Sequence, residues 1–445
     1  MTTTTKRHLT SAAVAAAVAC GLILTGCGDS DGADTPGGSG SDATGPVTVE
    51  FWGWVPEIET AIDAWNAANP DIQVNFSRIP GSSDLYPKAH AAVQAGNAPC
   101  LAQIAYYMMP SFLADGDLLD VTAEAANSKS VFVPWTWNQV TFGGKTYGIP
   151  QDTGPMVMFY RTDLFEQYGI SPAATWEQFA QDAAKVHAAS PDITLTNFGP
   201  DQPDLLAAFT SQAGGQWWEM GQDAWTVSID SAESLQVAEY WQNLISDGQV
   251  STIKRWDPEF YKQLEQGKVL ALVDAAWNSA LIASNEETLS GKWAVAPMPT
   301  WGSSATTANS GGSAVAVLKG CQNPQQAVDF ATWLNSAEES MRTLASPSGG
   351  GLYPAAVAAL DYGVVNQAEP FFGGQVIAEA FKASAEQVDV DWAWGPTYLD
   401  TNTALADGLA RVSTADQTIQ DLLKQVQAST LEDMAKKGIS AKAAG

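Results

Sequence analysis

Tryptophan is unusually abundant in this chain, and its placement suggests a chemistry. The 445 residues include 17 Trp. Trp65 fits a helical apolar stripe and belongs to a core, whereas Trp54, Trp277 and Trp394 lie beside Gly or Asn outside any such stripe. An indole face can bury the apolar C–H face of a pyranose ring. The ring's hydroxyls then need partners such as the carboxylate of Asp152, because an unpaired buried polar group is destabilising. These residue types favour binding of a carbohydrate.

Patterns typical of catalysis or of a bound metal are weak. Of the three His, His90 and His187 lie singly on helical stretches and His8 lies near the N-terminus, so we expect no metal site. The chain has no P-loop and no Gly-x-Ser-x-Gly elbow. We therefore predict no catalytic residues and no cofactor.

Two alternatives stay open. A glycoside hydrolase needs only a pair of carboxylates, and the 49 acidic residues provide pairs by chance. A binding protein for another solute, such as a peptide or a glycerol phosphodiester, is the second alternative. A phosphate would favour basic loops, and the candidate loops carry Trp, Tyr, Asp and Asn instead.

The stretch 145–165 must position these side chains. Residues 156–160 alternate as a β-strand does, with Met156 and Met158 on one face and Val157 and Phe159 on the other. Gly and Pro precede this strand, so the chain bends before entering it. We interpret the stretch as a crossing from one α/β lobe to a second, with residues 151–155 at the floor of the cleft between them.

Strands and helices alternate on both sides of this crossing. Such alternation predicts a mostly parallel sheet, and ligands bind beyond the carboxyl ends of its strands. Trp54 and the pair Tyr106 and Tyr107 follow two such ends. A second crossing is expected at 306–312. The expected strands are 47–51, 72–76, 101–105, 192–198, 269–273, 292–296 and 313–318, and the expected helices include 57–68, 84–95 and 175–188.

The first 46 residues form a targeting signal and a tether. A basic start, an uncharged apolar run and Leu-Thr-Gly-Cys27 have the layout of a lipoprotein signal peptide, so we expect cleavage after residue 26 and lipidation of Cys27. Residues 27–46 are too polar and Gly-rich to form a core. Outside the cell, Cys100 and Cys321 either form a disulfide or remain two buried thiols. The formal charge of −28 argues against a nucleic-acid partner.

Several motifs, taken in order, resemble the extracellular sugar-binding lipoproteins of bacterial ABC importers, of the maltose-binding-protein type. They are the lipobox, AWNAANPDIQV, GNAP followed by DLLDVT, GGKTYGIP with MFYRTDLF, TWEQF, QLEQGKVLALVDAAW and NPQQAVDFATWL. Cys100 departs from the pattern of these lipoproteins, in which an Asp commonly follows the Pro of GNAP.

The resemblance implies a two-lobed α/β fold of the class II periplasmic-binding-protein type that closes on a sugar. It implies a monomeric protein, anchored by lipid on the outer face of the cytoplasmic membrane, which delivers an oligosaccharide to permease subunits with a cytoplasmic ATPase. The implied N-terminal lobe is 47–152 with 312–347, and the C-terminal lobe is 156–308 with 350–445. The implied ligand contacts are Trp54, Tyr106, Tyr107, Asp152, Asp201, Gln202, Trp277, Asn278, Gly312, Ser313, Trp392 and Trp394.

Overall fold

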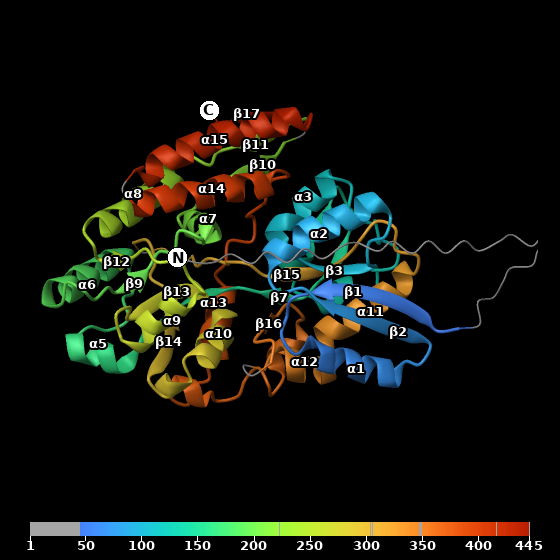
Figure 1. Cartoon of the computed structure of the whole chain (residues 1–445), viewed down its shortest axis with the longest axis horizontal. Helices are drawn as coiled ribbons and strands as arrows, with labels where there is room; N and C mark the ends of the chain where they lie inside the picture. Colours follow the sequence, from blue (N-terminus) through green and yellow to red (C-terminus); the bar gives the residue numbers. More distant parts are fainter. Residues whose placement is uncertain are drawn as a thin grey trace, which may run out of the picture. The chain divides into compact units, whose positions relative to one another are not determined.

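The computed structural model describes residues 45–444 except 222, 303, 305, 347, 348 and 415. The expected signal peptide, Cys27 and residues 27–44 of the expected tether lie outside the described residues. Residues 45–445 form one compact unit. Its sheets and helices are those of an α/β protein, and Figure 1 shows the two main sheets with helices around each.

The first lobe is built on a five-stranded sheet in the order β2-β1-β3-β15-β6. Strand β1 (Val47–Gly53) pairs in parallel with β2 (Ile72–Arg78) and β3 (Leu101–Ala105). Strand β15 (Ser313–Val317) returns from far along the chain and pairs antiparallel with β3 and with β6 (Gly148–Pro150). Alternate residues Val49, Phe51 and Gly53 of β1 are buried, as expected of a sheet covered by helices.

The second lobe is built around β8 (Met156–Arg161), which pairs antiparallel with β13 (Ala271–Ala275) and β14 (Trp293–Pro297). The predicted alternation of β8 is confirmed: Met156 and Met158 join one hydrophobic core, and Val157 and Phe159 join another. A parallel bridge from Thr194 to Val269 and the parallel pair β9 (Thr196–Asn197) and β12 (Val250–Ser251) extend the sheet beyond β13.

Three segments cross between the lobes and pair with one another. Strand β7 (Asp152–Thr153) pairs antiparallel with β16 (Tyr353–Pro354), and a bridge joins Pro155 to Asn309. The amide of Gln151 donates to the carbonyl of Ser313 at 2.9 Å. The crossings therefore form one hydrogen-bonded band.

Helices surround both sheets. Those near the first sheet include α1 (Ile58–Ala68), α2 (Ser82–Ala95), α3 (Met109–Ala114), α4 (Pro134–Asn138), α11 (Pro324–Ser336) and α12 (Glu338–Leu344). The others are α5 (Thr162–Tyr168), α6 (Trp176–Ala189), α7 (Pro203–Gln212), α8 (Ala232–Ser246), α9 (Pro258–Glu265), α10 (Asn278–Asn285), α13 (Ala378–Ala385), α14 (Tyr398–Ser413) and α15 (Ile419–Lys436).

The shorter elements complete the chain. The remaining strands are β4 (Thr141–Phe142), β5 (Lys145–Thr146), β10 (Trp218–Met220), β11 (Trp225–Val227) and β17 (Ala441–Ala443). The 3₁₀ turns are η1 (Tyr106–Met108), η2 (Lys129–Val131), η3 (Glu287–Leu289), η4 (Ala358–Asp361) and η5 (Pro370–Phe372). Among the described residues, no helix has the length and apolar character needed to cross a membrane.

A disulfide joins the two cysteines that the sequence left open. Cys100, just before β3, is bonded to Cys321, which follows β15, and their Cα atoms are 4.4 Å apart. The bond ties neighbouring strands that are 221 residues apart in sequence. It therefore links the start of β3 to the segment that returns to the first lobe.

Candidate functional site

The floor of the candidate site lies where β3 ends against the returning crossing. The amide of Tyr106 donates to the carbonyl of Gly312 at 3.0 Å. Gly312 has a positive φ of 82°, and a Cβ there would lie 2.8 Å from the Tyr106 ring and 3.0 Å from the Asp152 carbonyl oxygen. Glycine is therefore required on both counts, backbone conformation and close approach. The structure thus brings together Tyr106, Asp152 and Gly312 as the sequence predicted.

The Asp152 carboxyl is the principal polar group of this floor. Its Oδ1 accepts from the Ser313 amide at 2.8 Å and from the Ser313 hydroxyl at 2.6 Å. Burial raises its pKa to about 7, and the two hydrogen bonds from Ser313 oppose the rise. The adjacent Tyr106 hydroxyl is buried without a hydrogen-bond partner in the described part of the chain. Burial and the Asp152 charge raise the pKa of Tyr106.

A hydrogen-bond relay connects this floor to Trp54 in the loop after β1. The Trp54 amide donates to Oε1 of Gln103 at 3.0 Å, and Nε2 of Gln103 donates to the Ser313 hydroxyl at 3.2 Å. The Trp54 ring is partly exposed and meets Tyr86 edge to face, with centroids 6.1 Å apart. Trp54 is thus held by its backbone beside the floor while its indole keeps an open face.

The second lobe contributes Trp277 and Asn278 just beyond the end of β13. Nε1 of Trp277 donates to the carbonyl of Ser310 at 3.0 Å, which holds the partly exposed indole against the crossing segment. Asn278 is fully buried; its Nδ2 donates to Asp274 at 3.0 Å and its Oδ1 has no partner among the described residues. Asn278 therefore presents an unpaired acceptor rather than an exposed side chain.

Asp201 and Gln202 serve mainly to hold their own loop. Oδ1 of Asp201 accepts from the amide of Arg255 at 3.1 Å, and Nε2 of Gln202 donates to the Asp201 carbonyl at 2.9 Å. Both residues are partly exposed. Their side-chain contacts in the structure are thus to the protein itself.

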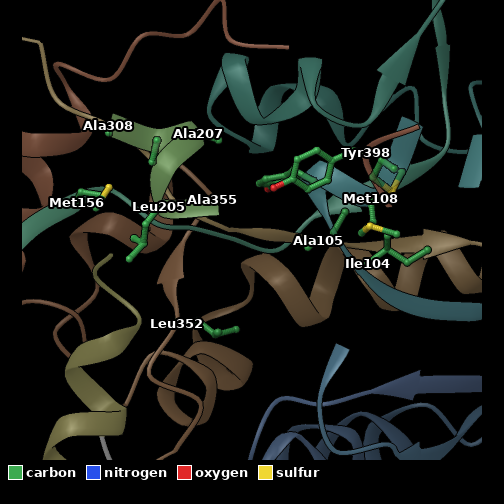
Figure 2. Close-up of a cluster of buried hydrophobic side chains, with 14 of the residues drawn as sticks. Ile104, Ala105, Met108, Met156, Leu205, Ala207, Ala308, Leu352, Ala355 and Tyr398 are labelled. Atoms are coloured by element: carbon green, nitrogen blue, oxygen red, sulfur yellow. The ribbon is translucent and has the colours of Figure 1, made fainter. Parts of the chain in front are cut away.

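Tyr107, Trp392 and Trp394 form an aromatic cluster with Tyr398. The rings of Tyr107 and Trp394 are 5.8 Å apart and those of Trp394 and Tyr398 are 4.7 Å apart. Tyr107 follows β3 whereas Tyr398 begins α14, so the cluster joins distant parts of the chain. Figure 2 shows Tyr398 among buried side chains that include Ile104 and Met108.

A small cavity lies between this cluster and the crossings. Its volume is about 20 Å³, enough for roughly one water molecule. A sugar ring is larger, so entry requires the walls to separate. The cavity is lined by Tyr106, Trp135, Gln139, Ala208, Ser211, Asn309, Val388, Asp389, Trp392 and Trp394.

The lining contains three of the predicted contacts and several residues that sequence reasoning missed. Tyr106, Trp392 and Trp394 were predicted, whereas Trp135 and Asn309 were not. Trp54 and Trp277 do not line this cavity. A local signal for Trp135 existed, since it precedes Trp137 within a Pro-initiated turn, but the sequence fits packing under the 141–146 hairpin equally well.

Unpaired polar atoms gather around the aromatic cluster. In the part of the chain that the structure describes, the Tyr398 hydroxyl, Nε1 of Trp392 and Nε1 of Trp218 are buried without a hydrogen-bond partner. Unsatisfied buried polar groups are uncommon in native proteins because each is costly. Of these three residues only Trp392 lines the cavity, so a ligand hydroxyl or a water molecule there would supply a partner for its Nε1.

His90 is not isolated, contrary to the sequence-based expectation. Its Nδ1 lies 2.6 Å from Oδ2 of Asp117, and Asp115 is near enough to form a group of three. Asp117 also accepts from Gln94 at 3.2 Å, and Asp115 pairs with Lys437 at 3.0 Å. These carboxylates already have protein partners, so the group is accounted for by structural contacts.

Comparison with known proteins identifies the family. The model of the family described as bacterial extracellular solute-binding protein matches residues 53–341. The chain belongs to this family. The sequence-based resemblance and the two-lobed α/β fold class are thereby confirmed, and the family description places such proteins outside the cell.

Relatives of this solute-binding protein cover most of its length. The galacto-N-biose-/lacto-N-biose I-binding protein of an ABC transporter from Bifidobacterium longum, solved with lacto-N-biose, is 29% identical with a TM-score of 0.82 over 90% of this chain and 100% of that one. A lactose-binding protein from Rhizobium radiobacter is 25% identical over 86% of this chain and 92% of its own. An arabinooligosaccharide-binding protein from Halalkalibacterium halodurans is 24% identical over 68% of this chain and 71% of its own length.

Proposed function

We propose that this solute-binding protein captures a short, uncharged oligosaccharide outside the cell and delivers it to the permease of an ABC importer, which a cytoplasmic ATPase drives. The observation that carries the proposal is the cavity walled by Tyr106, Trp135, Trp392 and Trp394. Aromatic faces suit sugar rings, and the unpaired buried polar atoms beside them suit sugar hydroxyls. The three relatives reported above are named for sugars, which supports the same ligand class.

The charge of the cavity favours a neutral solute. Asp389 is its one charged lining residue, and no Lys or Arg lines it among the described residues. A phosphate or carboxylate ligand would need cationic partners that this lining does not provide. A glycerol phosphodiester is therefore disfavoured.

Closure explains how such a site retains its ligand. Contacts from both lobes form only when the walls come together, so a sugar that touches both stabilises the closed state. The open state admits the sugar and the closed state holds it for the permease. We further propose that the protein is a monomer held at the outer face of the cytoplasmic membrane by lipid on Cys27, with 27–46 as its tether.

A panel of neutral mono- and oligosaccharides tests the proposal. A ligand that binds only the native state raises the melting temperature, so at least one oligosaccharide is expected to raise it and to show saturable binding by calorimetry. No response to any sugar would refute carbohydrate binding. Release of shorter sugars during incubation would instead support the glycoside hydrolase alternative.

A further inference from the structure

The loop at 252–257 leaves the second lobe at the same edge as the loops that carry Asp201 and Trp277. Strand β12 is parallel to β9, and the Thr194–Val269 bridge makes β9 parallel to β13. The carboxyl ends of the three strands therefore meet at one edge, where open α/β sheets bind ligands. Asp201 follows β9, Trp277 follows β13, and Trp256 follows β12. Trp256 thus lies at the edge of the sheet where ligands bind in such folds.

Arg255 fastens these three loops together. Its Nε donates to Oδ1 of Asn197 at 2.8 Å, and its amide donates to Asp201 at 3.1 Å. Its Nη1 forms an ion pair with Asp274, and both side chains are 1% exposed. The same Asp274 carboxylate accepts from Asn278. A buried guanidinium with this many partners fixes the loop geometry around the next residue, Trp256.

Trp256 has an unusual backbone conformation. Its φ is 67°, and among the described residues the only other non-glycine with a positive φ is Glu57. A bulky side chain is rarely found in this left-handed region, and the strain persists only where the surroundings impose it. Arg255 holds one side, and on the other Asp257 caps α9 by accepting from the Phe260 amide at 3.0 Å. Such strain is typical of functional positions.

The conformation places the Trp256 indole beside Trp277. The ring centroids are 5.9 Å apart with an interplanar angle of 52°, and Phe260 supports Trp256 from 5.7 Å. Both indoles are partly exposed. Trp277 is itself held to the Ser310 carbonyl of the crossing segment. The two indoles therefore pack against each other next to the crossing, and each keeps part of its surface exposed.

We propose that Trp256 contacts a second sugar ring while Trp277 contacts the first, so that Trp256 determines the preference of this protein for oligosaccharides over monosaccharides. The inference rests on the proposed sugar-binding function. One indole covers about one pyranose face, and a surface of two indoles matches two linked rings. The left-handed backbone of residue 256 accompanies this placement of the second indole beside the first.

The variant Trp256→Gly gives a selective test, because glycine adopts a positive φ without strain and so preserves the loop. Calorimetry is carried out on the parent and the variant with lacto-N-biose, lactose, β-1,6-galactobiose and arabinotriose, each beside its component monosaccharides. For the sugars that the parent binds, we expect the variant to lose about tenfold in oligosaccharide affinity and less than about twofold in monosaccharide affinity. Trp256→Phe is expected to restore part of the oligosaccharide affinity.

Trp301→Ala is the matched control, since Trp301 is also a partly exposed indole of the second lobe but lies against Trp176 and Tyr240 rather than against Trp277. It is expected to leave both affinities unchanged. Melting curves establish that each variant folds. Equal affinities in parent and Trp256→Gly, or equal losses for oligosaccharides and monosaccharides, would overturn the assignment of a second ring. Failure of the parent to bind any of these sugars would instead refute the proposed function.

Discussion

At the scale of single residues, Asp152 combines burial with a place at the crossing between lobes. Burial raises its pKa to about 7, well above the ordinary aspartate value of 3.8. At pH values between 3.8 and about 7, the Asp152 carboxyl is ionised in the unfolded chain but protonated in the folded protein. Its contribution to stability is therefore present at low pH and is lost as the pH rises through about 7.

Asp152→Asn tests this linkage. Asn is neutral at every pH and can still accept from Ser313, so the variant is expected to become more stable relative to the parent as the pH rises from about 4 to about 8. Urea unfolding across that range measures the difference. Asp274 and Glu286, with pKa values raised by burial to about 6 and about 7, leave the variant some residual pH dependence. The exposed Asp71→Asn is the control. A parent–variant difference that is constant with pH would contradict the prediction.

Trp277→Ala is expected to weaken sugar binding by tenfold or more, because the indole presents its partly exposed face beside the crossing. The fold should survive, since the ring lies at the edge of the core rather than within it. Calorimetry measures the affinity, and circular dichroism verifies the fold. Unchanged affinity in a folded variant would remove Trp277 from the site.

At the scale of elements, the Cys100–Cys321 bond fastens β3 to the end of β15, next to the floor that carries Tyr106 and Ser313. A cross-link between residues 221 apart restricts the unfolded chain strongly. Replacing both cysteines by serine is expected to lower the free energy of unfolding by about 2–5 kcal/mol. Chemical denaturation of the two proteins measures the loss.

Thiol titration provides the direct test of this bond. In a chain that begins after residue 27, Cys100 and Cys321 are the only cysteines. The denatured protein should show no free thiol before reduction and two afterwards. Two thiols before reduction would show that the bond does not form.

At the scale of the whole molecule, closure depends on contacts between elements of the two lobes. Lys437 at the end of α15 pairs with Asp115 after α3 at 3.0 Å, and the two side chains are 35% and 31% exposed. Exposed ion pairs contribute only about 0–1 kcal/mol and are screened by salt. This ion pair should therefore make only a small contribution to the free energy of lobe closure.

Lys437→Ala is accordingly expected to weaken sugar affinity by less than about fivefold, and raising the salt concentration should reduce the difference from the parent. Calorimetry at low and high ionic strength measures both effects. Lys442→Ala, on the neighbouring strand β17, is a control for the loss of a positive charge. A loss of more than tenfold would show that the ion pair dominates closure and that the aromatic contacts are secondary.

Local sequence patterns were sufficient to predict most of the elements and the family. The alternation of Met156 to Phe159 predicted a strand with two buried faces, and the position of Trp277 beyond a strand predicted its place at the carboxyl edge. These features follow from neighbouring residues, because strand and helix patterns are set by local spacing. The ordered motifs added the two-lobed fold, which the similarity to a solved sugar-binding protein confirmed.

The contacts between distant side chains can be seen only in the folded protein. The pairing of Asp152 with Ser313 joins residues 161 apart. Trp135 and Asn309, also far apart in the sequence, line one cavity, and His90 contacts Asp117. The left-handed backbone of Trp256 is opposed by the conformational preference of a Trp residue, and it likewise depends on the hydrogen bonds of Arg255 to distant residues. These contacts depend on packing and burial between residues far apart in the chain, so they could not be predicted from local sequence patterns.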